Sequence, residues 1–173
     1  HPLIRDDLVA RLKTGESLET IEKLINEEHA EPLITKGKIV GCVKRAHDVD
    51  QNLNAHVLFE NLVVKASGVL AGLHLVAKNN INPDEVEYVI ECSEEACGDM
   101  NQRGGGNFAK SIAEIIGFNN ATGSDTRGFC AAPTHALIVA SSLVQSGAVK
   151  NVVVLAGGST AKLGRSEEHT SEL

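Results

Sequence analysis

Aromatic side chains are scarce in this sequence, and tryptophan is absent. Aromatic residues make up 3% of the 173 positions, as four Phe and one Tyr. Proteins that bind single-stranded nucleic acid stack bases on aromatic faces, and such faces are few here. The formal net charge of −7 at pH 7 also disfavours contact with a phosphate backbone. We therefore expect no nucleic-acid partner.

Cysteine is sparse as well, and the four residues are irregularly spaced: Cys42, Cys92, Cys97 and Cys130. This spacing is not that of a disulfide framework, and it indicates a reducing compartment such as the cytoplasm. Long hydrophobic runs are also missing, because His, Lys, Asn or Gly interrupts each apolar stretch. We therefore expect no membrane-spanning segment and a cytoplasmic protein.

The hydrophobic pattern predicts the fold class. Residues 1–30 have a helical apolar period broken at Gly15, which predicts two short helices in an incomplete N-terminal appendage. From residue 31, strands and helices alternate, which predicts an α/β fold with a mainly parallel sheet, although many proteins share this pattern. The expected strands are 38–44, 86–92, 121–126 and 151–156, and the expected helices are 57–78, 108–116 and 134–146.

The last nine residues, Arg165–Leu173, read RSEEHTSEL. This string matches the in-frame translation of a common sequencing adapter, so we expect it to be an artefact and exclude it from the fold. The predicted organisation is therefore a helical appendage over 1–30, one α/β segment over 31–164, and the artefact over 165–173.

Cys130 has the setting of a nucleophile. It follows the short and special residues SDTRGF, and an apolar helical run begins soon after, at Thr134. A sulfur at a helix N-terminus lies near unpaired N–H groups and the positive end of the dipole, which favour the thiolate. A thiolate can attack an acyl carbon. Pro133 suits the first helical turn, where its missing N–H is not needed. The alternative is a buried structural cysteine.

Two charged residues come shortly before Cys130. Arg127 is a candidate for stabilising a thiolate or binding phosphate. Alternatively, Arg127 and Asp125 form a structural ion pair with each other or with neighbours. His135 follows Cys130 by five positions, on a side from which it does not easily reach the sulfur, so we expect it to pack within the helix.

The segment ECSEEACGDMNQRGGGN is unusual but matches no metal or phosphate motif. Cys92 and Cys97 are too far apart for a CxxC pair or a zinc knuckle, and the nearby acidic residues indicate a metal site only weakly. Gly104–Gly106 is not followed by the Lys-Ser/Thr pair of a P-loop. We therefore expect no metal site.

Longer strings carry a family resemblance. The run CAAPTHALIVASSLVQSGAVKNVVVLAGG resembles the nucleophile helix and following strand of the thiolase-like condensing enzymes, most closely ketoacyl-acyl-carrier-protein synthase III. The strings GKIVGCVKRAHDVDQNLNAHVLFENLVVKASGVLAGLHL, VIECSEEACGDMNQRGGGNFAKSIAEI and ATGSDTRGFCAAPTHALI are similar to the component C β-subunit family of glycine/sarcosine/betaine reductases. This second resemblance covers almost the whole chain.

The resemblance implies a thiolase-like fold of which this chain holds the N-terminal half, with a mainly parallel sheet, flanking helices and a buried nucleophile helix. Cys130 falls on the acylated cysteine of the family, and its backbone N–H on half of an oxyanion hole. The His and Asn partners of the family lie in the other half. The resemblance also implies a pocket shared with a dimer partner, lined by Glu94, Glu95, Cys97 and Arg103.

The implied activity belongs to anaerobic amino-acid fermentation. The family takes a carboxymethyl group from selenium on selenoprotein A and forms an enzyme-bound acetyl thioester, which phosphate cleaves to acetyl phosphate. The resemblance implies no organic cofactor in this subunit, phosphate as a co-substrate, and two partners, the component C α subunit and selenoprotein A. A homo- or hetero-oligomer is expected.

Two other functions stay open at this point. One is a ketoacyl synthase III-like acyltransferase that condenses an acyl thioester with a malonyl carrier protein; the net acidity of the chain is mildly against it. The other is a non-catalytic scaffold, because a fold does not determine a function. This chain alone is expected to be inactive and to associate, since a half fold exposes the face that packs on its other half.

Overall fold

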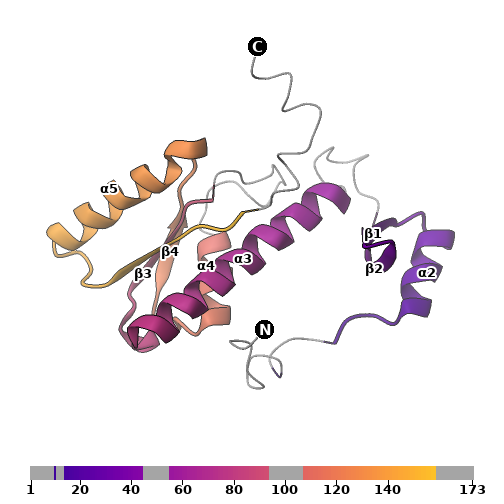
Figure 1. Ribbon diagram of the computed structural model, residues 1–173, viewed down its shortest axis with the longest axis horizontal. Coiled ribbons are helices and arrows are strands. Elements are labelled where there is room, and N and C mark those ends of the chain that lie inside the picture. Colours follow the sequence, from indigo (N-terminus) through magenta and orange to yellow (C-terminus); the bar gives the residue numbers. More distant parts are fainter. Residues whose placement is uncertain (1–9, 11–13, 45–54, 94–106, 159–173) are drawn as a thin grey trace, which may run out of the picture. The chain divides into compact units, whose positions relative to one another are not determined.

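The computed structural model describes residues 10, 14–44, 55–93 and 107–158 (Figure 1). The described residues form two compact units, one up to Asn61 and the other from Leu62 onward. This division differs from the boundary expected at residue 30, because the residues just after it group with the helical N-terminal segment. Residues 165–173 lie outside the described part.

The first unit contains a helix and a hairpin: α2 (Leu18–Glu27), β1 (Glu31–Thr35) and β2 (Lys38–Val43). Ser17 caps α2 by accepting a hydrogen bond from the backbone N–H of Thr20 at 3.1 Å. The first helix expected over 1–30 falls largely outside the described residues. The second is α2.

The strand expected over 38–44 forms, but its expected place in a parallel sheet is wrong. β2 pairs antiparallel with β1 in a separate two-stranded sheet. The connection consists of Lys36 and Gly37, which both have positive φ, 48° and 72°. Two successive positive φ values are typical of a type I′ turn, whose twist matches a hairpin. The tight turn therefore gives β2 the preceding strand as its partner.

The second unit contains the parallel sheet, with strand order β4-β3-β5. Its strands are β3 (Tyr88–Glu91), β4 (Thr122–Asp125) and β5 (Val152–Leu155). Its helices are α3 (Ala55–Asn79, from Leu62 on), α4 (Asn107–Ile116) and α5 (Ala132–Gln145), with 3-10 turns η1 (Pro83–Glu85) and η2 (Phe129–Ala131). The predicted α/β class with a parallel sheet is confirmed.

Alternating side chains divide the core into two layers, as the two-residue period of a strand requires. On β3, Val89 belongs to a cluster with α3 and α4, whereas Ile90 packs with α5. On β5, Val153 belongs to the same cluster as Val89, and Val154 packs against the same cluster as Ile90. Helices α3 and α4 therefore cover one face of the sheet and α5 covers the other (Figure 1).

Glycines allow α3 to approach α4 closely. A Cβ added at Gly68 would lie 2.8 Å from Cδ1 of Ile112, and one added at Gly72 would meet Ile116. By length and composition alone, Glu60–Asn79 of α3 is long and apolar enough to cross a membrane, so the expectation that no such stretch exists is wrong. Core helices meet the same criterion, and this helix packs on α4.

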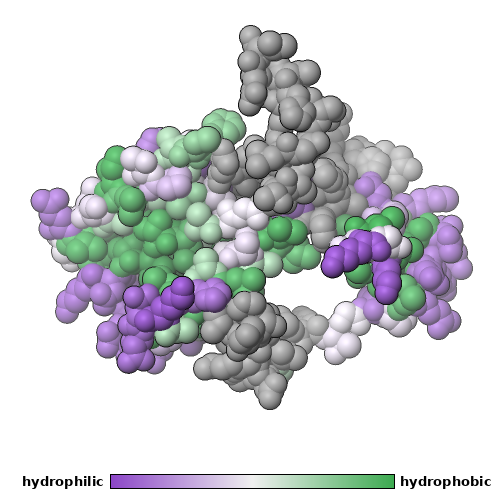
Figure 2. All heavy atoms as spheres, viewed as in Figure 1, coloured by the Kyte–Doolittle hydropathy of each residue, from purple (hydrophilic) through white to green (hydrophobic). Residues whose placement is uncertain are grey.

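The expectation of a buried nucleophile helix is also wrong for this chain. In α5 only Ala132 and Ala136 are buried. Leu137 and Ile138 are each 59% exposed, and Val139 and Val144 are exposed as well. One side of the helix packs on the sheet while the opposite side faces outward, and Figure 2 shows apolar atoms over α5 and the adjoining sheet.

Candidate functional site

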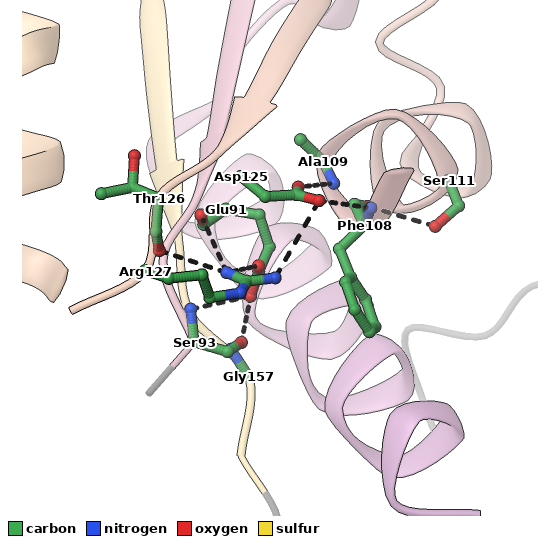
Figure 3. A network of polar contacts seen from close by, with 9 residues as sticks. All are labelled: Glu91, Ser93, Phe108, Ala109, Ser111, Asp125, Thr126, Arg127 and Gly157. Carbon is green, nitrogen blue, oxygen red and sulfur yellow. Dashed lines mark hydrogen bonds and ion pairs between the residues drawn. The ribbon is translucent and has the colours of Figure 1, made fainter. Parts of the chain in front are cut away.

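The candidate site lies at the carboxyl edge of the parallel sheet, where α/β proteins commonly bind ligands. The last residues of the three strands are in register, with Glu91 beside Asp125 on one side and beside Leu155 on the other. The chain continues from these ends into polar segments that contain Ser93 and Arg127 (Figure 3).

Arg127 is held by carboxylates. Its Nη1 lies 2.5 Å from Oε2 of Glu91, whose side chain is fully buried, and also donates to the carbonyl oxygen of Thr126 at 3.2 Å. Its Nη2 lies 3.9 Å from Oδ2 of Asp125. The guanidinium also lies over the Phe108 ring, 5.4 Å from its centroid, where the π face attracts a cation. The ion-pair interpretation therefore describes this side chain.

Asp125 has a second partner, the first turn of α4. Its two carboxylate oxygens accept hydrogen bonds from the backbone N–H groups of Phe108 at 3.2 Å and Ala109 at 2.9 Å. The first N–H groups of a helix have no partner within the helix, and they carry its positive dipole end. The N-terminus of α4 therefore compensates the Asp125 charge, and Glu91 remains as the close counter-ion of Arg127.

Ser93 and Gly157 extend this network to β5. Oε1 of Glu91 accepts a hydrogen bond from the Ser93 backbone N–H at 2.8 Å and another from the Ser93 hydroxyl. The hydroxyl oxygen of Ser93 in turn accepts from the Gly157 N–H at 2.9 Å. Glu91 therefore contacts the residues after β4 with one oxygen and, through Ser93, those after β5 with the other (Figure 3).

Cys130 lies in η2, directly before α5, and it is exposed. The expected place of its sulfur at a helix start is what the structure shows, and Pro133 lies in the first turn of α5. The buried structural cysteine of the alternative interpretation is not found at this position. An exposed thiol beside a helix N-terminus is in a setting that favours the thiolate.

The turn that presents Cys130 is conformationally strained. Phe129 has φ of 48°, in the left-handed region that non-glycine residues avoid at a cost of about 1–3 kcal/mol, and its side chain is 71% exposed. A Cβ added at Gly128 would lie 2.9 Å from Nδ1 of His135. His135, which was expected to pack within the helix, is exposed and lies against this turn.

The other described cysteines differ from Cys130. Burial, followed by the neighbouring Glu91 carboxylate, raises the pKa of the Cys92 thiol, and Arg127 opposes the shift only partly. Cys92 is therefore held as a neutral thiol in the core, in one cluster with Ile90 and with Ala132 and Ala136 of α5. Cys42 is half-buried in β2, less enclosed than a core position.

The remaining sequence candidates cannot be placed. Glu94, Glu95, Cys97 and Arg103 lie outside the described residues, so the shared pocket stays a prediction. Within the described segments, no group of three or more His, Cys, Asp or Glu side chains is arranged to hold a metal ion.

Sequence reasoning missed Glu91 and Ser93, whose hydrogen bonds and ion pair connect the carboxyl ends of the three strands. A signal was available, because Glu91 is a charged residue inside the otherwise apolar end of the predicted strand 86–92, and Ser93 directly follows that strand. Their partner Arg127 is 36 residues from Glu91, and the sequence pattern alone did not pair them.

Comparison with known proteins gives a close relative. No protein-family model matches the chain. Over 164 residues, or 95% of its length, the chain is 66% identical to the glycine/sarcosine/betaine reductase complex component C subunit beta of Peptoclostridium acidaminophilum. The chain spans 32% of the length of that relative.

A solved structure aligns more weakly. The priming β-ketosynthase from the R1128 polyketide biosynthetic pathway aligns with a TM-score of 0.45 and 27% identity, over 52% of this chain and 25% of that chain. An alignment of this score carries no argument about the fold. The sequence resemblance is confirmed: over almost its whole length, the chain is closely similar to the component C β subunit of glycine/sarcosine/betaine reductase.

Proposed function

We propose that this chain is part of a component C β subunit in a glycine, sarcosine or betaine reductase, and that Cys130 carries the acetyl group as a thioester. The observation that carries the proposal is the exposed Cys130 in the strained turn before α5. The 66% identity to a named component C subunit supports the assignment to this complex.

The chemistry needs a nucleophilic sulfur and a place for oxyanion charge. Cys130 meets the first need as a thiolate favoured by the N-terminus of α5. Its own backbone N–H is our candidate for one oxyanion donor. In the thioester-forming step the carbon–selenium bond breaks, the selenium returns to its protein as selenol, and the methylene carbon takes up two electrons and a proton to become a methyl group. The Cys130 sulfur bonds to the carboxyl carbon, and one carboxyl oxygen leaves as water with protons from solvent. Selenol and thiol groups of the partner proteins are the reductant class.

The release step returns Cys130 to its starting state. A phosphate oxygen attacks the thioester carbonyl carbon, a carbon–oxygen bond forms, and the carbon–sulfur bond breaks. The products are acetyl phosphate and the Cys130 thiolate, and the proton that the phosphate loses goes to solvent. Thiolate is a good leaving group, so the step needs no organic cofactor and uses phosphate only as a co-substrate.

The partners and the remaining site residues belong to the same proposal. The relative is named as one subunit of a multi-component complex, which supports partners for this chain. We assign these as the component C α subunit and selenoprotein A, within a cytoplasmic hetero-oligomer. Glu94, Glu95, Cys97 and Arg103 remain our candidates for the pocket lining.

Acetyl mapping tests this function. The full-length subunit with its α partner is incubated with acetyl phosphate, and acetylated cysteines are mapped by peptide mass spectrometry with and without hydroxylamine, which cleaves thioesters. We expect a hydroxylamine-sensitive acetyl group on Cys130, and loss of acetyl phosphate formation in Cys130→Ala but not in Cys42→Ala. Acetyl found only on the partner, with Cys130→Ala fully active, would support a scaffold instead.

A further inference from the structure

Arg127, three residues before the candidate nucleophile, forms an ion pair with the buried Glu91 carboxylate. We propose that Glu91 is a positioning residue: it holds Arg127 beneath the carboxyl edge of the sheet and so fixes the turn that presents Cys130. Neither the sequence motifs nor the name of the relative assigns a role to Glu91. The inference rests on the proposed function only for the identity of the nucleophile.

Of the two carboxylates near Arg127, Glu91 is the one whose charge the guanidinium compensates most directly. Asp125 is 3.9 Å from the guanidinium and is compensated by two N–H groups of α4. Glu91 is 2.5 Å from the guanidinium and fully buried. A buried carboxylate needs a counter-ion and hydrogen bonds, and Arg127 together with Ser93 supplies both.

The chain between this pair and Cys130 has little room to relax. It consists of Gly128, against which His135 lies, and Phe129, held at positive φ. A hydrogen bond from the Ala131 N–H to the Gly128 carbonyl oxygen at 3.0 Å closes the turn around Phe129 and Cys130. A backbone in such a conformation persists only where its surroundings over-determine it, and the Arg127 side chain is the tether on the strand side.

Loss of the Glu91–Arg127 ion pair is expected to lower the reactivity of the Cys130 sulfur. Without the Glu91 carboxylate, the Arg127 side chain, which is already 25% exposed, can swing toward solvent, and the turn can relax toward ordinary backbone angles. The Cys130 sulfur then shifts relative to the first N–H groups of α5. A misplacement of about 1 Å is enough to lower kcat by about 10²-fold.

The test uses three variants of the full-length subunit in its complex: Glu91→Gln, Arg127→Met, and both together. The rate of Cys130 alkylation by iodoacetamide is followed by peptide mass spectrometry, beside the thermal melting temperature and kcat. Glu91→Gln removes the close counter-ion of Arg127, and Arg127→Met leaves the buried Glu91 carboxylate without its cation, so each single variant is expected to melt lower. The double variant replaces the ion pair by uncharged groups, so its melting temperature is expected to recover.

Alkylation in the double variant decides the inference. We expect Cys130 to remain slow to alkylate and kcat to remain about 10²-fold low, with KM nearly unchanged, although stability has recovered. Recovery of the alkylation rate together with the melting temperature would show that the pair is only structural and would overturn the proposal. If the double variant still melts low, a comparison of Arg127→Lys with Arg127→Met decides. Lysine keeps a cation for Glu91 and methionine does not, so Cys130 is expected to be alkylated at a rate closer to wild type in Arg127→Lys than in Arg127→Met. Equal alkylation rates in the two variants would overturn the proposal.

A matched control is present on the same strand segment. Glu87 accepts hydrogen bonds from the Lys150 and Asn151 N–H groups at the opposite end of the sheet, so Glu87→Gln removes a carboxylate that links strand ends away from Cys130. It is expected to leave alkylation unchanged. Alkylation of Cys130 needs no reductase partner, so this test is independent of acetyl mapping. If the variants alter Cys130 alkylation but no acetyl group is found on Cys130, the proposed function is rejected and this inference stands.

Discussion

The carboxylate of Asp125 accepts a hydrogen bond from the backbone N–H of Ala109 at 2.9 Å, although 16 residues separate the two in sequence. The end of β4 therefore caps the helix that precedes it in the chain. Arg127 follows Asp125 by two positions and turns back toward the same carboxylate. One strand end thus stabilises α4 and begins the turn that leads to Cys130.

Removal of this cap is expected to destabilise the second unit. Asp125→Ala leaves two N–H groups at the start of α4 without their acceptor, and we expect a loss of about 0.5–2 kcal/mol in the free energy of unfolding. Asp125→Asn keeps an oxygen acceptor and is expected to lose less. Urea unfolding of the full-length subunit measures both, and equal stability of Asp125→Ala and wild type would contradict the cap.

Gly157 and Gly158 give a matched test of close packing after β5. A Cβ at Gly157 would collide with the backbone oxygen of Val64 in α3, whereas one at Gly158 meets nothing within 4 Å. We expect Gly157→Ala to destabilise by about 1–3 kcal/mol, as overpacking does, and Gly158→Ala to have little effect. Thermal melts compare the two, and similar melting temperatures would mean that α3 does not pack here as described.

Thiol labelling should separate two described cysteines. Cys130 is exposed before a helix, whereas Cys92 is buried and its pKa is raised by burial and by Glu91. Because only the thiolate reacts, we expect iodoacetamide to modify Cys130 quickly at neutral pH and Cys92 only after unfolding. Peptide mass spectrometry over a time course measures the modification rate of each cysteine. Modification of Cys92 at the same rate in the folded protein would be the contrary result.

The pKa of Glu87 predicts a pH dependence at the other end of the sheet. Hydrogen bonds from the backbone N–H groups of Lys150 and Asn151 lower its pKa from the ordinary value of 4.5. A carboxylate whose pKa is lower in the folded state contributes stability above the unfolded-state pKa and loses it as the pH falls through the folded-state pKa. We expect Glu87→Gln to be less stable than wild type near pH 7.

The same pair should converge in acid, below the folded-state pKa of Glu87, where both proteins carry an uncharged side chain. Urea unfolding at several pH values, under conditions where the rest of the protein stays folded, gives the difference between wild type and variant. A difference that stayed constant into acid would show that the effect of Glu87 is not ionic.

The outer face of α5 predicts association of the chain when it is expressed alone. Leu137 and Ile138 are exposed on a helix that is buried on one side only, and contiguous exposed apolar residues promote contact between molecules. We expect concentration-dependent association in analytical ultracentrifugation, and a shift toward monomer in Ile138→Lys. Leu18, exposed on α2, supplies a control as Leu18→Lys. A monomeric wild-type chain with a cooperative melt would contradict this.

Local patterns determined much of this protein. The helical period and the short residues before Cys130 predicted that its sulfur lies at a helix start, and η2 followed by α5 shows this. The strands around Ile90 and Val153 were also predictable, because continuous apolar runs bounded by turn residues are typical of a parallel sheet. These features depend on residues within a few positions of each other, which a sequence shows directly.

Only the tertiary structure decided which side chains and strands pair with each other. The sequence offered Arg127 either a role at the thiolate or an ion pair, and the fold brought Glu91 to it from 36 positions away. The tight turn at Lys36 and Gly37 gave β2 an antiparallel neighbour instead of a place in the parallel sheet. The family resemblance implied that α5 is buried. Burial of a helix depends on what covers both of its sides, and the described residues cover only one side of α5. Periodicity specifies which face of an element is apolar, whereas the choice of partner depends on contacts that are distant in sequence.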